Sequence, residues 1–139
     1  MQVYNKSAPI SLIIDLHGHS KSYNSFFYGN PPKKDLVPGS LEDPQLFPYF
    51  CSKKIKQVSF TQSTFSITED KNNSARVVLS ELFPKAHVYT LENSFHGWRR
   101  ERGSFIHDYT PEVLRKIGKD ILLTYFEFER VCEKNPQIT

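Results

Sequence analysis

Two histidines that flank a glycine form the densest group of chemically active side chains in the sequence. His17 and His19 lie in the hexapeptide Asp-Leu-His-Gly-His-Ser at residues 15–20, at the end of an apolar, β-branched run. A neutral imidazole is a common metal ligand, and Gly18 lets the backbone approach a ligand closely. In open α/β sheets, ligands bind outside the carboxyl ends of the strands. The pattern indicates a metal site, although strand-end histidines held only by hydrogen bonds have the same local sequence.

Predicted β-strands position these histidines and a later glutamate. Residues 11–16 are nearly continuously apolar, which is typical of a strand buried on both faces of a largely parallel sheet. Residues 87–91 read His-Val-Tyr-Thr-Leu and predict a second buried strand, and Glu92 follows it as His17 follows the first. Residues 25–28 predict a third, short strand. We expect the ends of the first two strands to present His17 and Glu92 side by side to one cleft.

Two shorter segments predict helices beside this sheet. A helix of a few turns fits residues 44–55, where Pro48 limits its length. A second helix fits residues 75–82, because Ser74 is a good N-cap and the apolar residues at positions 75, 78, 79 and 82 fall on one face. That face is expected to pack against the core.

The strongest helical pattern comes last in the chain. Thr110 is the cap, Pro111 takes the first helical position, and Glu112 complements the helix dipole. Apolar residues then keep helical spacing to about residue 132, at Val113, Ile117, Ile121, Leu122, Tyr125, Phe128 and Val131.

The composition places the chain among globular proteins of one domain. It has 139 residues, of which 38% are hydrophobic and 24% charged, with a net charge of +3. That charge is far below the clustered charge of a nucleic-acid binder, and no run approaches the roughly 18 apolar residues that cross a bilayer. The apolar run at residues 10–16 is too short for a signal peptide and contains Asp15. We therefore expect a cytoplasmic protein in which Cys51 and Cys132 are free thiols.

Two families of metal enzymes have a motif like the hexapeptide. In phosphoesterases of the polymerase-and-histidinol-phosphatase (PHP) type, a strand resembling Asp-Leu-His-x-His-Ser supplies two metal ligands one residue apart. In the cytosolic zinc carboxypeptidases, Asp-x-His-Gly-His-Ser supplies the third zinc ligand, and an aromatic segment ending in Tyr-Gly follows it. Residues 24–29 of this chain read Asn-Ser-Phe-Phe-Tyr-Gly. The hexapeptide alone fits both families.

The later motifs distinguish the two. The phosphoesterase pattern continues with a Ser-Asp-Gly type of turn and further clusters of histidine ligands, neither of which this sequence contains. The carboxypeptidase pattern continues with Lys-Asn-Asn-Ser-Ala-Arg-Val-Val, present at residues 71–78, then Tyr-Thr-Leu-Glu-Asn-Ser-Phe-His-Gly, present at residues 89–97, and a terminal helix near residues 114–118. Over residues 10–128 the chain thus resembles the zinc carboxypeptidases of the cytosolic, tubulin-deglutamylating subgroup.

The resemblance implies an architecture and a substrate. The fold would be α/β, with a mixed, mainly parallel sheet and flanking helices, as in carboxypeptidases and related hydrolase-like folds. Residues 1–132 would form the C-terminal half of the catalytic domain, and residues 133–139 a frayed tail. The cofactor would be zinc, and the substrates would be acidic protein C-terminal tails such as those of polyglutamylated tubulin.

The resemblance also implies residue roles. His17 corresponds to the single downstream zinc ligand, and Glu92 to the general base that takes a proton from water and passes it to the leaving amine. Arg76 corresponds to the floor of the pocket for the last side chain of the substrate, where its planar fork suits a glutamate carboxylate. Lys71 lies in a loop that approaches the substrate and adds a second positive charge. His19 shapes the site rather than binding zinc.

The chain departs from the family in its other metal ligands. The family has two more zinc ligands in an upstream His-x-x-Glu pair and an Asn-Arg clamp for the terminal carboxylate, and neither motif occurs here. One protein ligand is too few for a catalytic zinc site, which usually has three. The chain is therefore expected to be either a fragment of a longer metallocarboxypeptidase or a shortened, inactive relative that acts as a binding module.

Three basic runs lie outside these motifs, at residues 33–34, 53–56 and 99–102. Such runs are usually solvated faces. They would also suit the steering of an acidic tail towards a cleft, and the sequence leaves open whether they share a surface.

Overall fold

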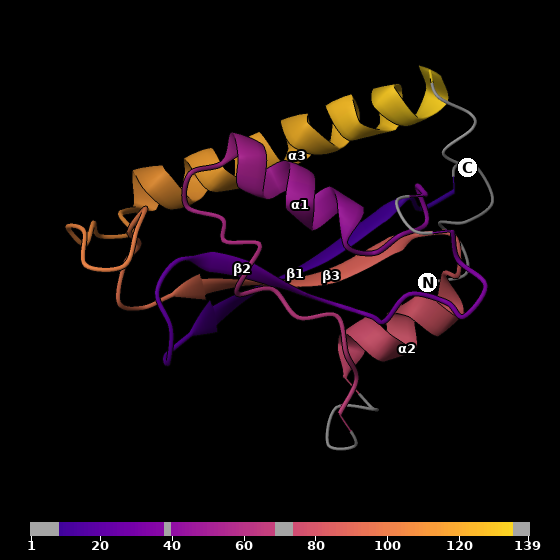
Figure 1. Cartoon of the computed structure of the whole chain (residues 1–139), viewed down its shortest axis with the longest axis horizontal. Helices are drawn as coiled ribbons and strands as arrows, with labels where there is room; N and C mark the ends of the chain where they lie inside the picture. Colours follow the sequence, from indigo (N-terminus) through magenta and orange to yellow (C-terminus); the bar gives the residue numbers. More distant parts are fainter. Residues whose placement is uncertain (1–8, 38–39, 69–73, 135–139) are drawn as a thin grey trace.

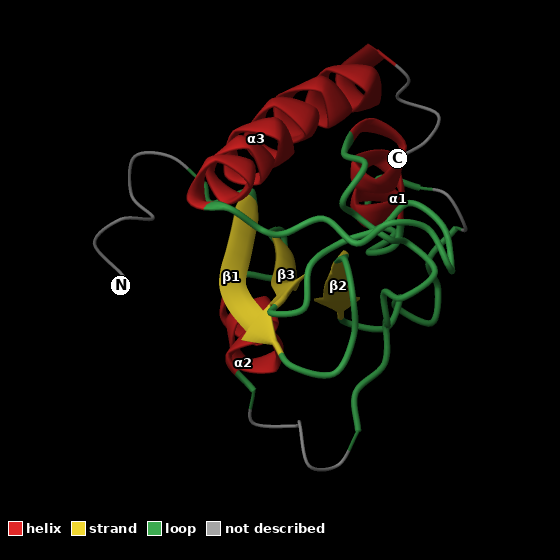
Figure 2. Cartoon of the chain, turned by 90° about the vertical axis from the view of Figure 1, so that its left-hand side faces the viewer, coloured by secondary structure: helices red, strands yellow, loops and turns green. Residues whose placement is uncertain are grey.

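A computed structural model describes residues 9–37, 40–68 and 74–134 of the chain (Figure 1). The elements in chain order are β1 (Leu12–His19), β2 (Ser25–Gly29), α1 (Leu46–Lys54), α2 (Ala75–Leu82), β3 (His87–Ser94) and α3 (Pro111–Lys134). Helices α1 and α3 lie over one face of the sheet, and α2 lies under the other (Figure 2). The predicted α/β fold is confirmed.

The three strands form a mixed sheet in the order β1-β3-β2. Strand β3 is central; β1 runs parallel to it and β2 antiparallel. All three predicted strands are present, and β1 and β3 are each longer at their carboxyl ends than the sequence indicated. His17 and Glu92 therefore lie within strands rather than just after them.

Strand β1 corrects one expectation. The apolar run at residues 11–16 predicted a strand buried on both faces, but β1 is an edge strand, and Leu16 is 67% exposed. Leu12 and Ile14 do pack against the core from the side of α3. The difference arises because the described residues give β1 a neighbour on one side only.

Aromatic side chains fill the core between the sheet and the helices α1 and α3. Phe47 of α1 is fully buried at its centre, with ring centroids 5.3–6.1 Å from those of four other rings, which belong to Phe27, Tyr89, Tyr125 and Phe128. Edge-on contacts at this spacing stabilise a core beyond the burial of apolar area alone. Helix α1 lies inside the predicted range 44–55. Pro48 is accommodated in its first turn, where a backbone N–H is not required.

The terminal helix begins as predicted. The Oγ1 atom of Thr110 accepts a hydrogen bond from the backbone N–H of Val113 at 3.3 Å, and Pro111 is the first helical residue. Leu122 and Val131 are exposed, whereas the sequence placed them on the core face. The buried stripe of α3 is narrower than predicted, and these two residues lie just outside it. The helix continues to Lys134, and the remainder of the expected tail lies outside the described residues.

Helix α2 has the predicted bounds but buries a different face. Arg76 and Val77 are buried, while Val78 and Leu82 of the predicted apolar face are exposed. Ser74 occupies the N-cap position, yet its hydroxyl makes no capping hydrogen bond. The orientation follows from Arg76, whose guanidinium reaches the end of β2, a contact that apolar periodicity does not encode.

Cys51 and Cys132 are both free, as predicted, and both are buried. Among the helices formed by the described residues, none has the length and apolar character needed to cross a membrane.

Candidate functional site

The register of the sheet places His17 directly beside Glu92. The two residues are paired across the parallel strands β1 and β3, and paired residues project their side chains from the same face. Leu91 packs in the core beneath α3, so its neighbour Glu92 projects to the opposite face, where α2 lies. The predicted side-by-side arrangement of His17 and Glu92 is therefore present.

The hollow that borders His17 is not shared with Glu92. A hollow of about 580 Å³ borders His17, but it lies between β1, β3 and α3. Its lining includes Leu16, Gly18 and Leu91 and does not include Glu92. The cleft shared by His17 and Glu92 therefore stays a prediction.

Glu92 is a buried carboxylate with an unused oxygen. The residue is only 7% exposed, and within the described ranges its Oε2 atom has no hydrogen-bond partner. The Nδ1 atom of His19 lies 4.0 Å away, beyond hydrogen-bond distance. A buried acceptor without a partner is unfavourable for folding, and such groups are concentrated where chemistry uses them. Its burial between Phe26 on β2 and His17 on β1 marks Glu92 as a candidate for a reacting group.

The two histidines have different surroundings. The His17 side chain is 60% exposed, and its Nδ1 atom lies 3.3 Å from Oδ2 of Asp15, two residues earlier on the same face of β1. A carboxylate on one ring nitrogen orients the imidazole so that the other nitrogen can bind a metal. His19 is largely buried and packs edge-on against Phe26, with ring centroids 4.9 Å apart. These surroundings suit His17 as a ligand and His19 as a residue that shapes the wall beside Glu92.

Arg76 reaches the same face of the sheet from α2. It is 5% exposed, and its Nη1 atom donates hydrogen bonds to the carbonyl of Gly29 and, at 2.7 Å, to Oδ1 of Asn30. Burial lowers the pKa of Arg76, and the neighbouring Tyr28 opposes that shift. The arginine is therefore an anchor for the end of β2 as well as a charge near the site.

Tyr28 lies close enough to both Arg76 and Glu92 to feel their charges. It is paired with Thr90, two residues before Glu92, and so it projects from the same face. Burial raises the pKa of Tyr28, the Glu92 carboxylate raises it further, and Arg76 lowers it. The sequence reading missed both Tyr28 and Asp15 as members of this face. Period-two alternation from His17 is the signal that would have found Asp15, whereas Tyr28 joins the face through the pairing of β2 with β3.

The described residues do not complete a metal centre. Within residues 9–37, 40–68 and 74–134, no group of three or more histidine, cysteine or acidic side chains is placed to hold a metal ion. The oriented imidazole of His17 and the unpartnered oxygen of Glu92 nevertheless suit one ligand and one base of a zinc site whose other ligands come from elsewhere. Lys71, the other predicted substrate contact, lies outside the described residues.

Known proteins resemble this chain in sequence over nearly all of its length. Human cytosolic carboxypeptidase 6 is 26% identical over 133 residues, which are 94% of this chain and 26% of that protein. Zebrafish (Danio rerio) cytosolic carboxypeptidase 2 is 34% identical over 88% of this chain and 16% of its own length, and mouse cytosolic carboxypeptidase 3 is 31% identical over 87% and 12%. The chain matches no protein-family model.

The fold also has a counterpart among solved structures. A metallo-carboxypeptidase from Burkholderia cenocepacia superposes with a TM-score of 0.67 at 14% identity, covering 94% of this chain and 33% of that one. The chain thus spans about a quarter or less of the curated relatives described above, and a third of this structural neighbour.

Proposed function

Since this chain belongs to the cytosolic carboxypeptidase family, we propose that it forms the C-terminal half of the catalytic domain of a zinc carboxypeptidase that removes C-terminal glutamate residues from proteins. The observation that carries the proposal is the pairing of His17 with Glu92 across β1 and β3. The relatives are carboxypeptidases, which favours this reading over the phosphoesterase alternative. Their names also suggest that the protein works in the cytoplasm.

In this proposal His17, Glu92 and Asp15, which share one face of the sheet, have different roles in peptide hydrolysis. Zinc, when bound through His17 and ligands from outside this chain, would polarise the scissile carbonyl. Glu92 takes a proton from the attacking water and delivers it to the leaving amine, so that one peptide bond is exchanged for a carboxylate and an amine. Its buried position keeps competing water from the carboxylate, and Asp15 holds the His17 ring in the orientation that ligation needs.

Arg76 is proposed to select the terminal residue. Its Nη1 atom is engaged with Gly29 and Asn30, and a guanidinium has further N–H donors on Nε and Nη2. These would bind the side-chain carboxylate of a terminal glutamate, and Lys71 would add a second positive charge. Acidic tails such as that of tubulin are the substrates that this arrangement fits.

A second candidate function is a binding module without catalysis. It is favoured by the absence, among the described residues, of a group able to hold a metal. The reading frame upstream of Met1 discriminates between the two candidates. A frame that encodes His-x-x-Glu and Asn-Arg favours the enzyme, and a stop codon without them favours the module.

The catalytic test uses a protein that joins this chain to a segment with the missing ligands. Peptides ending in several glutamates are incubated with the zinc-loaded protein, and the products are identified by mass spectrometry. The proposal predicts stepwise loss of terminal glutamate, and Glu92→Gln should abolish it because an amide cannot accept the proton. Retained turnover in Glu92→Gln would remove Glu92 from the mechanism.

The selectivity test compares peptides ending in glutamate and in leucine. Arg76→Ala should cost about 2–5 kcal/mol for the glutamate peptide, as expected when one partner of a buried charge pair is removed, and much less for the leucine peptide. The result is expressed as the ratio of the two kcat/KM values, so that a general loss of folded protein cancels. An equal fall for both substrates would reduce Arg76 to a structural residue.

A further inference from the structure

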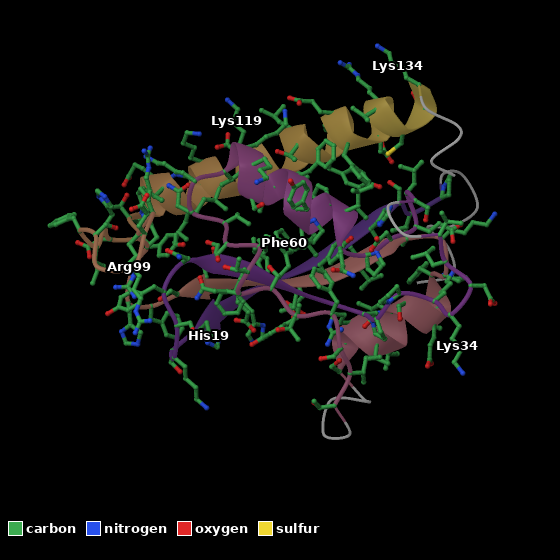
Figure 3. The ribbon with its side chains drawn as sticks, in the orientation of Figure 1. His19, Lys34, Phe60, Arg99, Lys119 and Lys134 are labelled. Atoms are coloured by element: carbon green, nitrogen blue, oxygen red, sulfur yellow. The ribbon has the colours of Figure 1, made fainter. Side chains whose placement is uncertain are left out.

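The structure gives the members of the three basic runs different surroundings. Lys33 pairs with Glu42 at 3.8 Å, Lys54 pairs with Glu127, and Lys53 lies over the ring of Tyr49. Figure 3 places Lys34 at the opposite end of the molecule from His19, whereas Arg99 lies at the same end as His19. Only some of the basic side chains in the three runs therefore lie near the candidate site.

Two cations from different runs meet at that end, and each lies over an aromatic ring. The Nζ atom of Lys56 lies 4.8 Å from the ring centroid of Trp98, and the Cζ atom of Arg99 lies 4.6 Å from that of Tyr23. Trp98 is itself buried and stacks on His107, with centroids 4.4 Å apart. Cation–π contacts of this kind hold both charged groups in defined positions. We call Lys56 and Arg99 the basic rim.

The backbone beneath the basic rim is tightly held. Asn24 accepts a hydrogen bond on Oδ1 from the backbone N–H of Arg99 at 2.7 Å and donates its own backbone N–H to the carbonyl of Gly97 at 3.0 Å. Gly97 has a φ of 98°, and a Cβ atom there would meet the carbonyl of His107 at 2.4 Å. The loop after β3 is thus fastened to the residue that precedes β2, so the rim is a built feature and not a mobile tip.

The basic rim borders the carboxyl ends of the two strands that carry the site. The backbone N–H of Phe95, just after β3, donates to the carbonyl of His19 at the end of β1, at 2.8 Å. Arg99 follows four residues later. Among the described residues, no carboxylate forms an ion pair with Lys56 or with Arg99. Two held cations without acidic partners among the described residues therefore lie at the end of the sheet where β1 and β3 finish.

We propose that the basic rim binds side-chain carboxylates of an acidic peptide whose terminal residue enters the site at Glu92. The inference rests on the proposed function and adds to it the residues that recognise the peptide upstream of the bond to be cut. Arg99 offers a planar fork for a carboxylate, and Lys56 offers a point charge. Because their aromatic partners already restrict both side chains, binding loses less conformational entropy than it would with free lysines and arginines.

The test measures peptide binding to this chain by fluorescence anisotropy, with labelled oligoglutamate and oligoglutamine peptides of equal length. Trp98 is the only tryptophan in the sequence, so its emission also reports directly on events at the rim. Lys56→Gln and Arg99→Gln should each weaken oligoglutamate binding about two- to five-fold, and the double variant about ten-fold. Raising the salt concentration should weaken wild-type binding and abolish the difference between the variants.

Matched variants keep the proposal falsifiable. Lys119→Gln removes a positive charge from α3, away from the rim, and should leave binding unchanged (Figure 3). Arg99→Lys retains the charge and should keep most of the affinity. The proposal that the basic rim binds carboxylates would be refuted if oligoglutamine bound as tightly as oligoglutamate. Wild-type affinity in a folded double variant would also refute it. Unaltered binding in the double variant together with cleavage that depends on Glu92 would refute the rim and leave the proposed function standing.

Discussion

Replacing Arg76 with alanine tests whether the buried guanidinium stabilises the fold as well as facing the site. The substitution removes both hydrogen bonds from Nη1, to the buried carbonyl of Gly29 and to Oδ1 of Asn30. Hydrogen bonds from charged groups contribute about 1.5–3 kcal/mol each, and an acceptor left buried without a partner costs about 1–3 kcal/mol. Asn30 is partly exposed and can turn to water, so most of the loss comes from Gly29. We expect Arg76→Ala to lower the free energy of unfolding by about 2–4 kcal/mol.

The assay is equilibrium unfolding in urea, followed by the emission of Trp98. The midpoint should fall while the slope of the unfolding free energy against urea is unchanged, because the exposed area on unfolding is the same. Asn30→Ala keeps the bond to Gly29 and should cost less, about 1 kcal/mol. Arg115→Ala is the matched control, since that arginine is exposed and its one ion pair among the described residues is with Glu112. It should change stability by no more than about 0.5 kcal/mol.

An Arg76→Ala midpoint equal to that of Arg115→Ala would refute this reasoning. The guanidinium would then contribute nothing to the fold, and the orientation of α2 would need another cause. The predicted loss, in contrast, explains why selectivity must be measured as a ratio between substrates. A destabilised variant loses activity on both peptides, and only the ratio of the two kcat/KM values reports the effect of Arg76 on substrate selectivity.

Three further outcomes follow from the core, the tyrosines and the metal ligands. Phe47→Ala should cost about 3–5 kcal/mol in the same unfolding assay, because the ring is fully buried among aromatic neighbours; a cost below that of Asn30→Ala would contradict the described core. Burial raises the pKa of Tyr109 and of Tyr125 to about 12, so the folded chain keeps their protons longer than the unfolded chain does. The free energy of unfolding should keep its full tyrosine contribution below pH 10 and decrease between pH 10 and 12. In Tyr125→Phe this decrease should be smaller. Calorimetry on this chain alone should detect only weak zinc binding, and tight equimolar binding would revive the two-histidine phosphoesterase reading.

The helices and strands could be located from the sequence because their signals are local. Thr110 and Pro111 mark the start of α3 within four residues, and the structure confirms the capping bond. The β-branched run before His17 and the run before Glu92 each indicate a strand without reference to any other part of the chain. The periodicity of α3 likewise identifies most of the residues that it buries.

The buried faces of helices and the neighbours of strands were harder to predict, because they depend on residues far away in the sequence. The buried face of α2 is fixed by the contact of Arg76 with Gly29, a residue 47 positions earlier, and apolar spacing gave the wrong face. The exposure of Leu16 depends on whether another strand pairs with the open edge of β1. The spacing of apolar residues predicts neither the buried face of α2 nor the exposure of Leu16.

The site was predicted in outline and corrected in detail. The family resemblance selected His17 and Glu92, and the sheet register pairs them. It is the register, however, that brings His19 within 4.0 Å of the carboxylate, and the alternation of strands that adds Asp15 and Tyr28 to the same face. Register depends on the pairing of β1 and of β2 with β3, which follows them by more than 55 residues, so the places of His19 and Tyr28 on this face emerge only from the structure.

We propose that His17 is a zinc ligand and that Glu92, beside it, is a base that does not bind the metal. The most direct measurement is the zinc content of the protein that joins this chain to the missing ligands, determined by plasma mass spectrometry after dialysis. We predict equimolar zinc in the wild type, in Glu92→Gln and in the control His96→Ala, whose exposed ring contacts the carbonyl of Ser20 and the ring of Tyr23. We predict loss of zinc in His17→Ala. Zinc retained by His17→Ala, or lost from Glu92→Gln, would contradict the assignment.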